Sequence, residues 1–220
     1  MLNTLMTRYK FIKFKVNELY AELNIQSYPI DPFEIINHFS NIILIPYSRY
    51  MQDFNYSLEQ MLKMTKSKLG CCQHQISYDR YMILYNDKCN CKGRILWTII
   101  HELGHIMCNH YFLTFPATVT NKEIYDFKER EANFFASIFL AHPAILKKLD
   151  IQCSTDLEIY CSLSKEAASY RYKNFKSYDI NHKGIYSDAL VVDNFQKYLD
   201  DRYDDFLVHK KLMDAFKIAY

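Results

Sequence analysis

Glycine and proline are scarce in this chain, with only 4 and 5 residues respectively among 220. Their scarcity argues against sheet sandwiches, collagen-like segments and flexible Gly-rich linkers. No apolar run approaches the ~18 residues that a membrane-spanning helix needs, so no contact with a membrane is expected. A net charge of only +2 gives no electrostatic case for direct binding of nucleic acid.

The cysteines lack the pattern of a disulfide framework, since there are 7 of them and the number is odd. The first residues are interrupted by Arg8, Lys10 and Lys13, so they lack the apolar core of a secretory signal. Free thiols in a reducing cytoplasm are therefore expected. The pairs Cys71–Cys72 and Cys89–Cys91 do not have the spacing of a structural zinc site either.

What the chain does contain is a large apolar fraction, 50% of its residues, with 19 Tyr and 15 Phe. Such a composition predicts an ordered protein with a substantial core. Periodicity and capping signals predict helices at about 2–23, 32–39, 57–70, 94–110, 122–141, 144–149, 155–161, 164–175 and 188–217. Residues 41–46 predict a strand, and 71–85 predict a hairpin whose second strand is Tyr81–Tyr85.

The predicted fold class is therefore α+β, a mostly helical domain with a small three-stranded sheet. A polar, turn-rich stretch at 177–187 suggests a boundary between a domain at 1–176 and an amphipathic C-terminal helix at 188–220. That helix could also pack back onto the same domain.

The most informative motif is His101-Glu102-Leu103-Gly104-His105, which lies inside the predicted helix 94–110. Residues four apart share one face of a helix, so the two imidazoles can converge on a single metal ion. Glu102 is adjacent and can act on a water molecule at that metal, which is the arrangement of zinc metalloproteases. Gly104 is expected to let a neighbouring element pack closely against the motif helix.

A catalytic zinc site usually takes a third protein ligand. The metzincin class is excluded, because Cys108 and Tyr111 stand where its extended motif requires glycine and histidine. The following helix offers Glu129 and Glu131, which lie about 200° apart around the helix axis, so only one of them can face the metal. The spacing alone leaves both open.

In the predicted mechanism, zinc lowers the pKa of its water toward ~7, and Glu102 moves the proton from that water to the leaving amine. His110 and His142 are candidates to support the ligands. The donor that stabilises the oxyanion is open between Tyr111, Tyr125 and His110. Zinc proteases often bind an extended peptide along a sheet edge. The predicted edge strand carries Tyr81, Ile83 and Tyr85.

The paired motifs resemble those of the ImmA/IrrE metallo-endopeptidases. The resemblance rests on Ile99–Ile106, on Glu129-Arg-Glu-Ala-Asn-Phe-Phe-Ala136 and on Leu140-Ala-His-Pro143. Weaker similarity extends over about 25–176, including the Asp31-Pro32 helix start and Leu163–Ala168 with Arg171. The resemblance implies a zincin-like fold and one Zn²⁺ ion per chain. It assigns the metal to His101, His105 and Glu131, catalysis to Glu102, and a supporting role to Asn133.

The resemblance also implies a function in gene regulation. Members of this family are typically cytoplasmic and cleave a DNA-binding repressor, often of the helix-turn-helix type, encoded by the same mobile element or operon. An alternative is an antirepressor that keeps the zinc site and binds its partner without cutting it. His142 and the cysteine pairs depart from the family pattern, and neither departure affects the predicted zinc site.

Overall fold

The computed structural model describes residues 6–181 and 186–203, with side chains described outside 177–187. Its helices are α1 (Tyr9–Glu22), α2 (Pro32–Asn37), α3 (Tyr47–Phe54), α4 (Leu58–Thr65), α5 (Lys92–Met107), α6 (Asn121–Leu140), α7 (Pro143–Lys148), α8 (Ser154–Cys161), α9 (Lys165–Asn181) and α10 (Tyr186–Asn194). Its strands are β1 (Ile42–Pro46), β2 (Gly70–Gln75) and β3 (Arg80–Tyr85). The predicted α+β class, mostly helical with one small three-stranded sheet, is confirmed.

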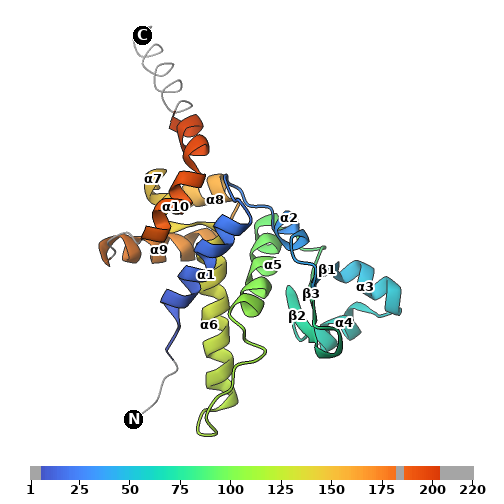
Figure 1. The fold of residues 1–220 in the computed structure, drawn as a ribbon. Helices are drawn as coiled ribbons and strands as arrows, with labels where there is room; N and C mark the ends of the chain where they lie inside the picture. Colours follow the sequence, from blue (N-terminus) through green and yellow to red (C-terminus); the bar gives the residue numbers. More distant parts are fainter. Residues whose placement is uncertain (1–5, 182–185, 204–220) are drawn as a thin grey trace.

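The sheet has the strand order β1-β3-β2, with β1 parallel and β2 antiparallel to the central strand β3. A 3₁₀ turn at Ile76–Tyr78 joins β2 to β3, and Asp79 adopts the left-handed conformation with a φ of 47°. The sheet lies beside α5, while α3 and α4 lie on its far side (Figure 1). The motif helix is therefore held between the sheet and α6.

Gly104 allows the close packing of α5 against α6. A Cβ atom at this position would lie 3.1 Å from a ring carbon of Phe135 and 3.2 Å from the Cα of Ala132. These distances are tighter than nine in ten real Cβ contacts, so a side chain here would require Phe135 or Ala132 to give way by a few tenths of an ångström. The expectation that Gly104 permits close packing is confirmed.

The N-terminal helix and the C-terminal segment share one core with α6. Tyr20 on α1 is fully buried, and its hydroxyl donates a hydrogen bond of 2.6 Å to the Phe139 carbonyl. Its ring packs near Phe195, which follows α10 and is also fully buried. Lys13 forms a buried ion pair of 2.7 Å with Asp188 on α10. Helix α10 and Phe195 thus pack onto the helices that precede them.

Local capping signals account for several element boundaries. Asp31 accepts a hydrogen bond from the Phe33 amide at the start of α2, and capping boxes begin α4 and α6 at Ser57 and Thr120. These side chains satisfy backbone amides that a helix leaves unpaired at its start. The predicted starts of these three helices are correct to within a residue.

Other boundaries differ from the predictions. The first helix begins only at Tyr9, and the preceding Arg8 has its backbone amide bonded to Glu131. Residues 2–5 of the predicted helix lie outside the described residues. Helix α3 was not expected, and α5 ends at Met107 rather than near His110. The predicted helix 188–217 is interrupted at Phe195 and resumes over 196–203, and its remainder lies outside the described residues.

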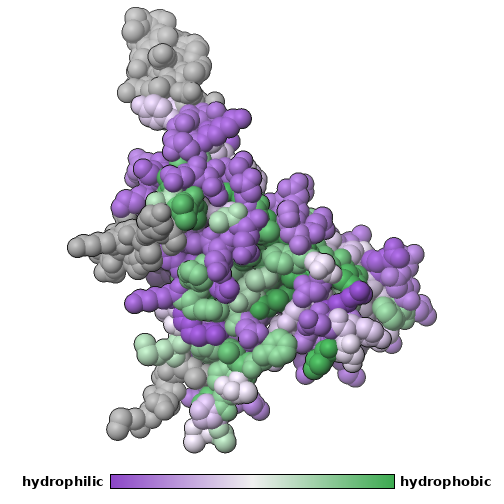
Figure 2. Space-filling view, viewed as in Figure 1, coloured by the Kyte–Doolittle hydropathy of each residue, from purple (hydrophilic) through white to green (hydrophobic). Residues whose placement is uncertain are grey.

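Within the described part of the chain, no helix combines the length and the apolar character needed to cross a membrane. On the face drawn in Figure 2, apolar residues gather in the middle, where α1, α5 and α6 lie. The α10 end and the α3 side of this face are mostly polar. The surface around the motif helix is therefore the most apolar part of this view.

Candidate metal centre

The two histidines of the motif meet one carboxylate of α6. His101 and His105 lie one helical turn apart on α5, and their Nε2 atoms are 3.1 Å apart. Each Nε2 lies 3.4 Å from an oxygen of Glu129. These three side chains offer ligand atoms that all lie within 4.8 Å of one another. We call His101, His105 and Glu129 the cleft cluster.

Both imidazoles are held through the other ring nitrogen. Nδ1 of His101 lies 3.1 Å from Oδ1 of Asn133, which follows Glu129 by one turn on the same face of α6. Nδ1 of His105 lies 2.9 Å from Nδ1 of His110. A hydrogen bond at Nδ1 fixes the ring and leaves Nε2 to bind a metal. The supporting position predicted for Asn133 agrees with this geometry.

Glu131 lies on the other side of α6, and this corrects the ligand set derived from the resemblance. Its side chain is fully buried and is paired with Arg8, whose backbone amide and Nε donate hydrogen bonds of 2.7 and 3.0 Å to Oε1. Nε2 of His110 lies 3.0 Å from its Oε2. The helix rotation turns Glu129 toward His101 and His105 and turns Glu131 into the interior.

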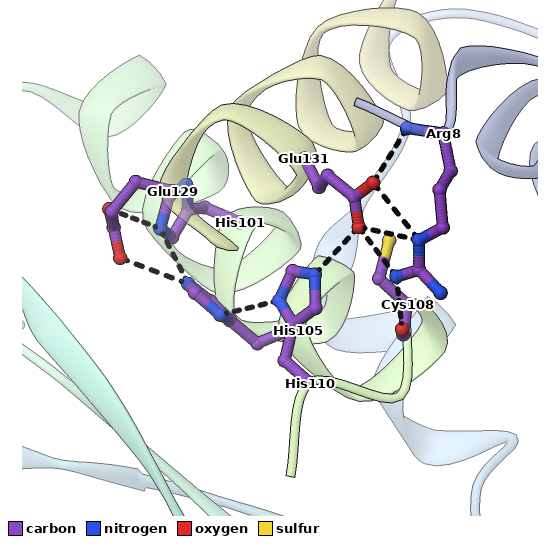
Figure 3. A network of polar contacts seen from close by, with 7 residues as sticks. All are labelled: Arg8, His101, His105, Cys108, His110, Glu129 and Glu131. Carbon is purple, nitrogen blue, oxygen red and sulfur yellow. Dashed lines mark hydrogen bonds and ion pairs between the residues drawn. The ribbon is translucent and has the colours of Figure 1, made fainter. Parts of the chain in front are cut away.

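Figure 3 shows the two clusters side by side, with Glu129 on one side of the histidines and Glu131 with Arg8 on the other. The second group consists of Cys108, His110 and Glu131, all buried, and we call it the inner cluster. Hydrogen bonds from His110 and Arg8 outweigh the effect of burial and lower the pKa of Glu131 to about 2. Glu131 is therefore an ionised carboxylate whose charge is balanced by Arg8.

His110 reaches His105 because the motif helix ends early. Cys108 closes α5, and Asn109 then takes a left-handed conformation with a φ of 60°. This turn brings His110 back beneath His105, where its amide donates a hydrogen bond of 3.0 Å to the His105 carbonyl. The predicted extension of the motif helix to residue 110 is therefore wrong, and the candidacy of His110 as a supporting residue gains a direct contact.

Glu102 lines the same cleft as the cleft cluster. Burial, together with the nearby charge of Glu129, raises the pKa of Glu102 to about 7, while His101 and the backbone of Cys72 oppose the rise. A carboxyl group with a pKa near neutrality can both accept and release a proton, which general acid–base catalysis requires. The predicted catalytic position of Glu102 is consistent with this environment.

The cleft has a volume of about 540 Å³ and contains the ligand atoms, Glu102 and two tyrosines. Tyr111 donates a hydrogen bond of 3.1 Å to the Cys72 carbonyl, and burial raises the pKa of its phenol strongly. Tyr125 lies one helical turn before Glu129 and is well exposed. Of these two phenols, Tyr125 is the better placed to meet a bound molecule.

The edge strand beside this cleft is β2. Strand β3, with Tyr81, Ile83 and Tyr85, pairs with neighbours on both sides and is the centre of the sheet, so predicting it as the edge was wrong. Cys71 and Cys72 of β2 line the cleft, and the Cys72 backbone bonds the Tyr111 and Glu102 side chains. The outer backbone of β2 therefore faces the cleft cluster.

All seven cysteines are free thiols. Burial and the charge of Glu102 raise the pKa of Cys71 and of Cys72 to about 12, so both thiols stay protonated near neutral pH. Among the described residues, neither Cys71–Cys72 nor Cys89–Cys91 joins a group of side chains that could hold a metal.

Residues 57–173, more than half of the chain, match the family model of a peptidase domain described as the IrrE N-terminal-like domain. The matched segment includes β2, β3, α5 and α6, and with them the whole cleft cluster. Arg8 lies outside it. No curated protein matches the chain.

Proposed function

Because the chain belongs to the peptidase family whose domain is described as IrrE N-terminal-like, we propose that it is a zinc-dependent endopeptidase acting in the cleft around His101 and His105. The observation that carries this proposal is the convergence of two imidazole Nε2 atoms and the Glu129 carboxylate beside Glu102. Two histidines, one glutamate and an open side are the donor set of catalytic zinc in proteases.

The donor atoms fit a metal of this kind. Both Nδ1 atoms are engaged, so both Nε2 atoms present lone pairs to the same point. His101 and His105 also lower the pKa of Glu129 well below its usual range, although burial opposes them, so this carboxylate is ionised. A zinc ion held there would supply Lewis acidity for the scissile carbonyl and an activated water.

Glu102 would perform the proton transfers. Its carboxylate accepts the proton of the attacking water and delivers it to the nitrogen of the leaving amine. Tyr125 would donate a hydrogen bond to the oxygen on which negative charge develops. The support for this role is the exposure of Tyr125 and its position one turn from Glu129 on the cleft side of α6.

The substrate would bind as an extended peptide along β2. The outer backbone of this strand faces the cleft, and added strands form hydrogen bonds that do not depend on sequence. A second pocket of about 390 Å³ adjoins the cleft and shares Trp97, Thr98 and Asn133 with it. Its other walls include Ala167 and Tyr170, together with the polar side chains of Arg94, Ser164 and Glu166, and the mostly apolar pocket is suited to a large apolar side chain of the peptide.

The biological substrate we propose is a DNA-binding repressor of the helix-turn-helix type, cut in the cytoplasm at an apolar segment. The family resemblance supports this choice, and the apolar pocket supports the kind of segment. Neighbouring genes on the same mobile element or operon are the place to look for the repressor.

The decisive variant is Glu102→Gln, which keeps the shape of the side chain and removes its ability to accept a proton. The zinc content of the purified chain should stay near one ion, while cleavage of the repressor should fall by about 10²- to 10⁴-fold. Glu22→Gln, on the exposed end of α1, is the matched control and should behave like the native chain.

If Glu102→Gln still relieves repression as well as the native chain does, the protein is an antirepressor that binds without cutting. A purified native chain that binds no zinc would refute the proposed metal centre itself.

A further inference from the structure

A continuous chain of hydrogen bonds runs from the cleft cluster into the interior. It leads from Nδ1 of His105 to Nδ1 of His110 over 2.9 Å, and from Nε2 of His110 to Oε2 of Glu131 over 3.0 Å. Arg8 closes the chain with its amide and guanidinium on Glu131 (Figure 3). His110 and Glu131 are almost completely buried, at 2% and 0% exposed.

The positions of the protons in this series of hydrogen bonds follow from the Glu131 end. Glu131 is ion-paired with Arg8, and a carboxylate only accepts hydrogen bonds, so Nε2 of His110 must carry a proton and donate it. With a single proton on its ring, at Nε2, His110 accepts at Nδ1, so Nδ1 of His105 must carry a proton. The only lone pair left on His105 is that of Nε2, the atom that faces Glu129.

We propose that His110 and Glu131, anchored by Arg8, are positioning residues that fix the ring and the tautomer of His105 for metal binding. The inference rests on the proposed function, since it concerns the metal of the same cleft. Residues that orient a ligating histidine through its second nitrogen contribute strongly to metal affinity. The support of His101 involves one residue rather than a series, since its Nδ1 is bonded by Asn133.

The inner cluster has the donors of a second metal site, but its charges argue against one. Arg8 already supplies the cation, since its guanidinium pairs with Glu131 and donates a hydrogen bond of 2.7 Å to the Cys108 carbonyl. Burial and the charge of Glu131 raise the pKa of the Cys108 thiol to about 12, so the thiolate that binds metals is not formed. The inner cluster therefore serves the cleft cluster and does not duplicate it.

Arg8 connects this chain of contacts to the N-terminal segment. It lies immediately before α1, and its guanidinium also stacks near the rings of Phe11 and Phe127, 5.0 and 5.7 Å from their centroids. A residue outside the family-matched segment thus completes the support of a metal ligand inside it. Affinity for metal should consequently depend on the docking of the N-terminal segment.

The test measures Zn²⁺ affinity of the full-length chain by competition with a chromophoric chelator, together with the visible absorption of the Co²⁺-loaded protein. His110→Leu removes both hydrogen bonds and should weaken Zn²⁺ binding by about 10- to 100-fold and alter the Co²⁺ spectrum. His110→Gln supplies an acceptor oxygen and a donor amide, so it should restore most of the affinity.

His142→Leu is the matched control, because it also removes a buried histidine. His142 bonds Asn17 and the Ala144 amide, away from the cleft cluster, so its loss should lower stability and leave Zn²⁺ affinity unchanged. If His110→Leu does not fold, Arg8→Gln tests the same series of hydrogen bonds at its partly exposed end. This variant should weaken Zn²⁺ binding several-fold.

Native Zn²⁺ affinity in folded His110→Leu, or in Arg8→Gln, would overturn the inference while leaving the zinc site itself in place. A native chain that binds no Zn²⁺ would instead refute the proposed function.

Discussion

On one side of α6 Glu129 meets two imidazoles across an open cleft, and on the other Glu131 meets one imidazole and a guanidinium in the interior. The two carboxylates lie two residues apart, and both clusters contain the donor types that bind transition metals. The two clusters differ in that an arginine pairs with the carboxylate of the inner cluster. Glu131 is already ion-paired with Arg8, whereas the printed ion-pair partners of Glu129 among the described residues are two imidazoles, which can instead share a metal with it.

Removing each of the two carboxylates in turn should produce the largest effects. Glu129→Ala removes a ligand, so we expect Zn²⁺ affinity to fall by at least ~100-fold, more than for loss of an outer supporting residue. Glu131→Ala leaves Arg8 and His110 buried against each other, so we expect a loss of about 3 kcal/mol in the free energy of unfolding.

Chelator competition and chemical denaturation of both variants would show these two phenotypes. If Glu131→Ala lost zinc more completely than Glu129→Ala, the ligand assignment made from the geometry would be reversed.

The two cleft tyrosines provide the next contrast. Tyr125→Phe removes the phenol placed to stabilise the oxyanion, so we expect kcat to fall by about 100-fold while zinc stays bound. Tyr111→Phe removes a hydroxyl already bonded to the Cys72 carbonyl, so we expect a decrease of less than ~10-fold. Steady-state kinetics on a cleavable peptide would decide between them, and equal effects would exclude a special role for Tyr125.

Gly104 affects both clusters because it sets the distance between α5 and α6. We expect Gly104→Val to cost about 1–3 kcal/mol through overpacking against Ala132 and Phe135. Zinc affinity should fall with it, since His101, His105 and Glu129 come from the two helices that separate. Thermal unfolding with and without Zn²⁺ would measure both effects, and an unchanged melting temperature would show that the contact can relax.

The smallest expected effect concerns the apolar pocket beside the cleft. Tyr170→Ala should raise KM by about 10-fold for peptides with a large apolar residue at the accepted position and change little for peptides with a small one. Tyr203→Ala, at another exposed tyrosine, is the control. A uniform loss across all peptides would argue that this pocket does not select the substrate.

The sequence predicted local features well and relations between distant segments poorly. Spacing placed His101, Glu102 and His105 on one helix, and capping residues located the starts of α2, α4 and α6. The choice between Glu129 and Glu131 depends on the rotation of α6, which tertiary packing through Ala132 and Gly104 determines. Helical periodicity could show only that the two carboxylates face different ways.

The remaining errors have similar causes. The central position of β3 follows from its parallel pairing with β1, a contact across more than thirty residues that no local pattern reveals. His110 was displaced from its expected position by the left-handed turn at Asn109. Arg8 lies 123 positions from Glu131, and nothing in the neighbouring residues marks it as the partner of a buried carboxylate.

The packing of α1 and α10 onto α6 limits where the chain can be cut or exchanged between relatives. A fragment trimmed to residues 57–173 would leave the Phe139 ring without Tyr20 and the Glu131 carboxylate without Arg8. The segment that matches the family model is therefore smaller than the unit that packs around it in the structure. In a chimaera between relatives, the N-terminal helix should be exchanged together with the motif helices, as one piece.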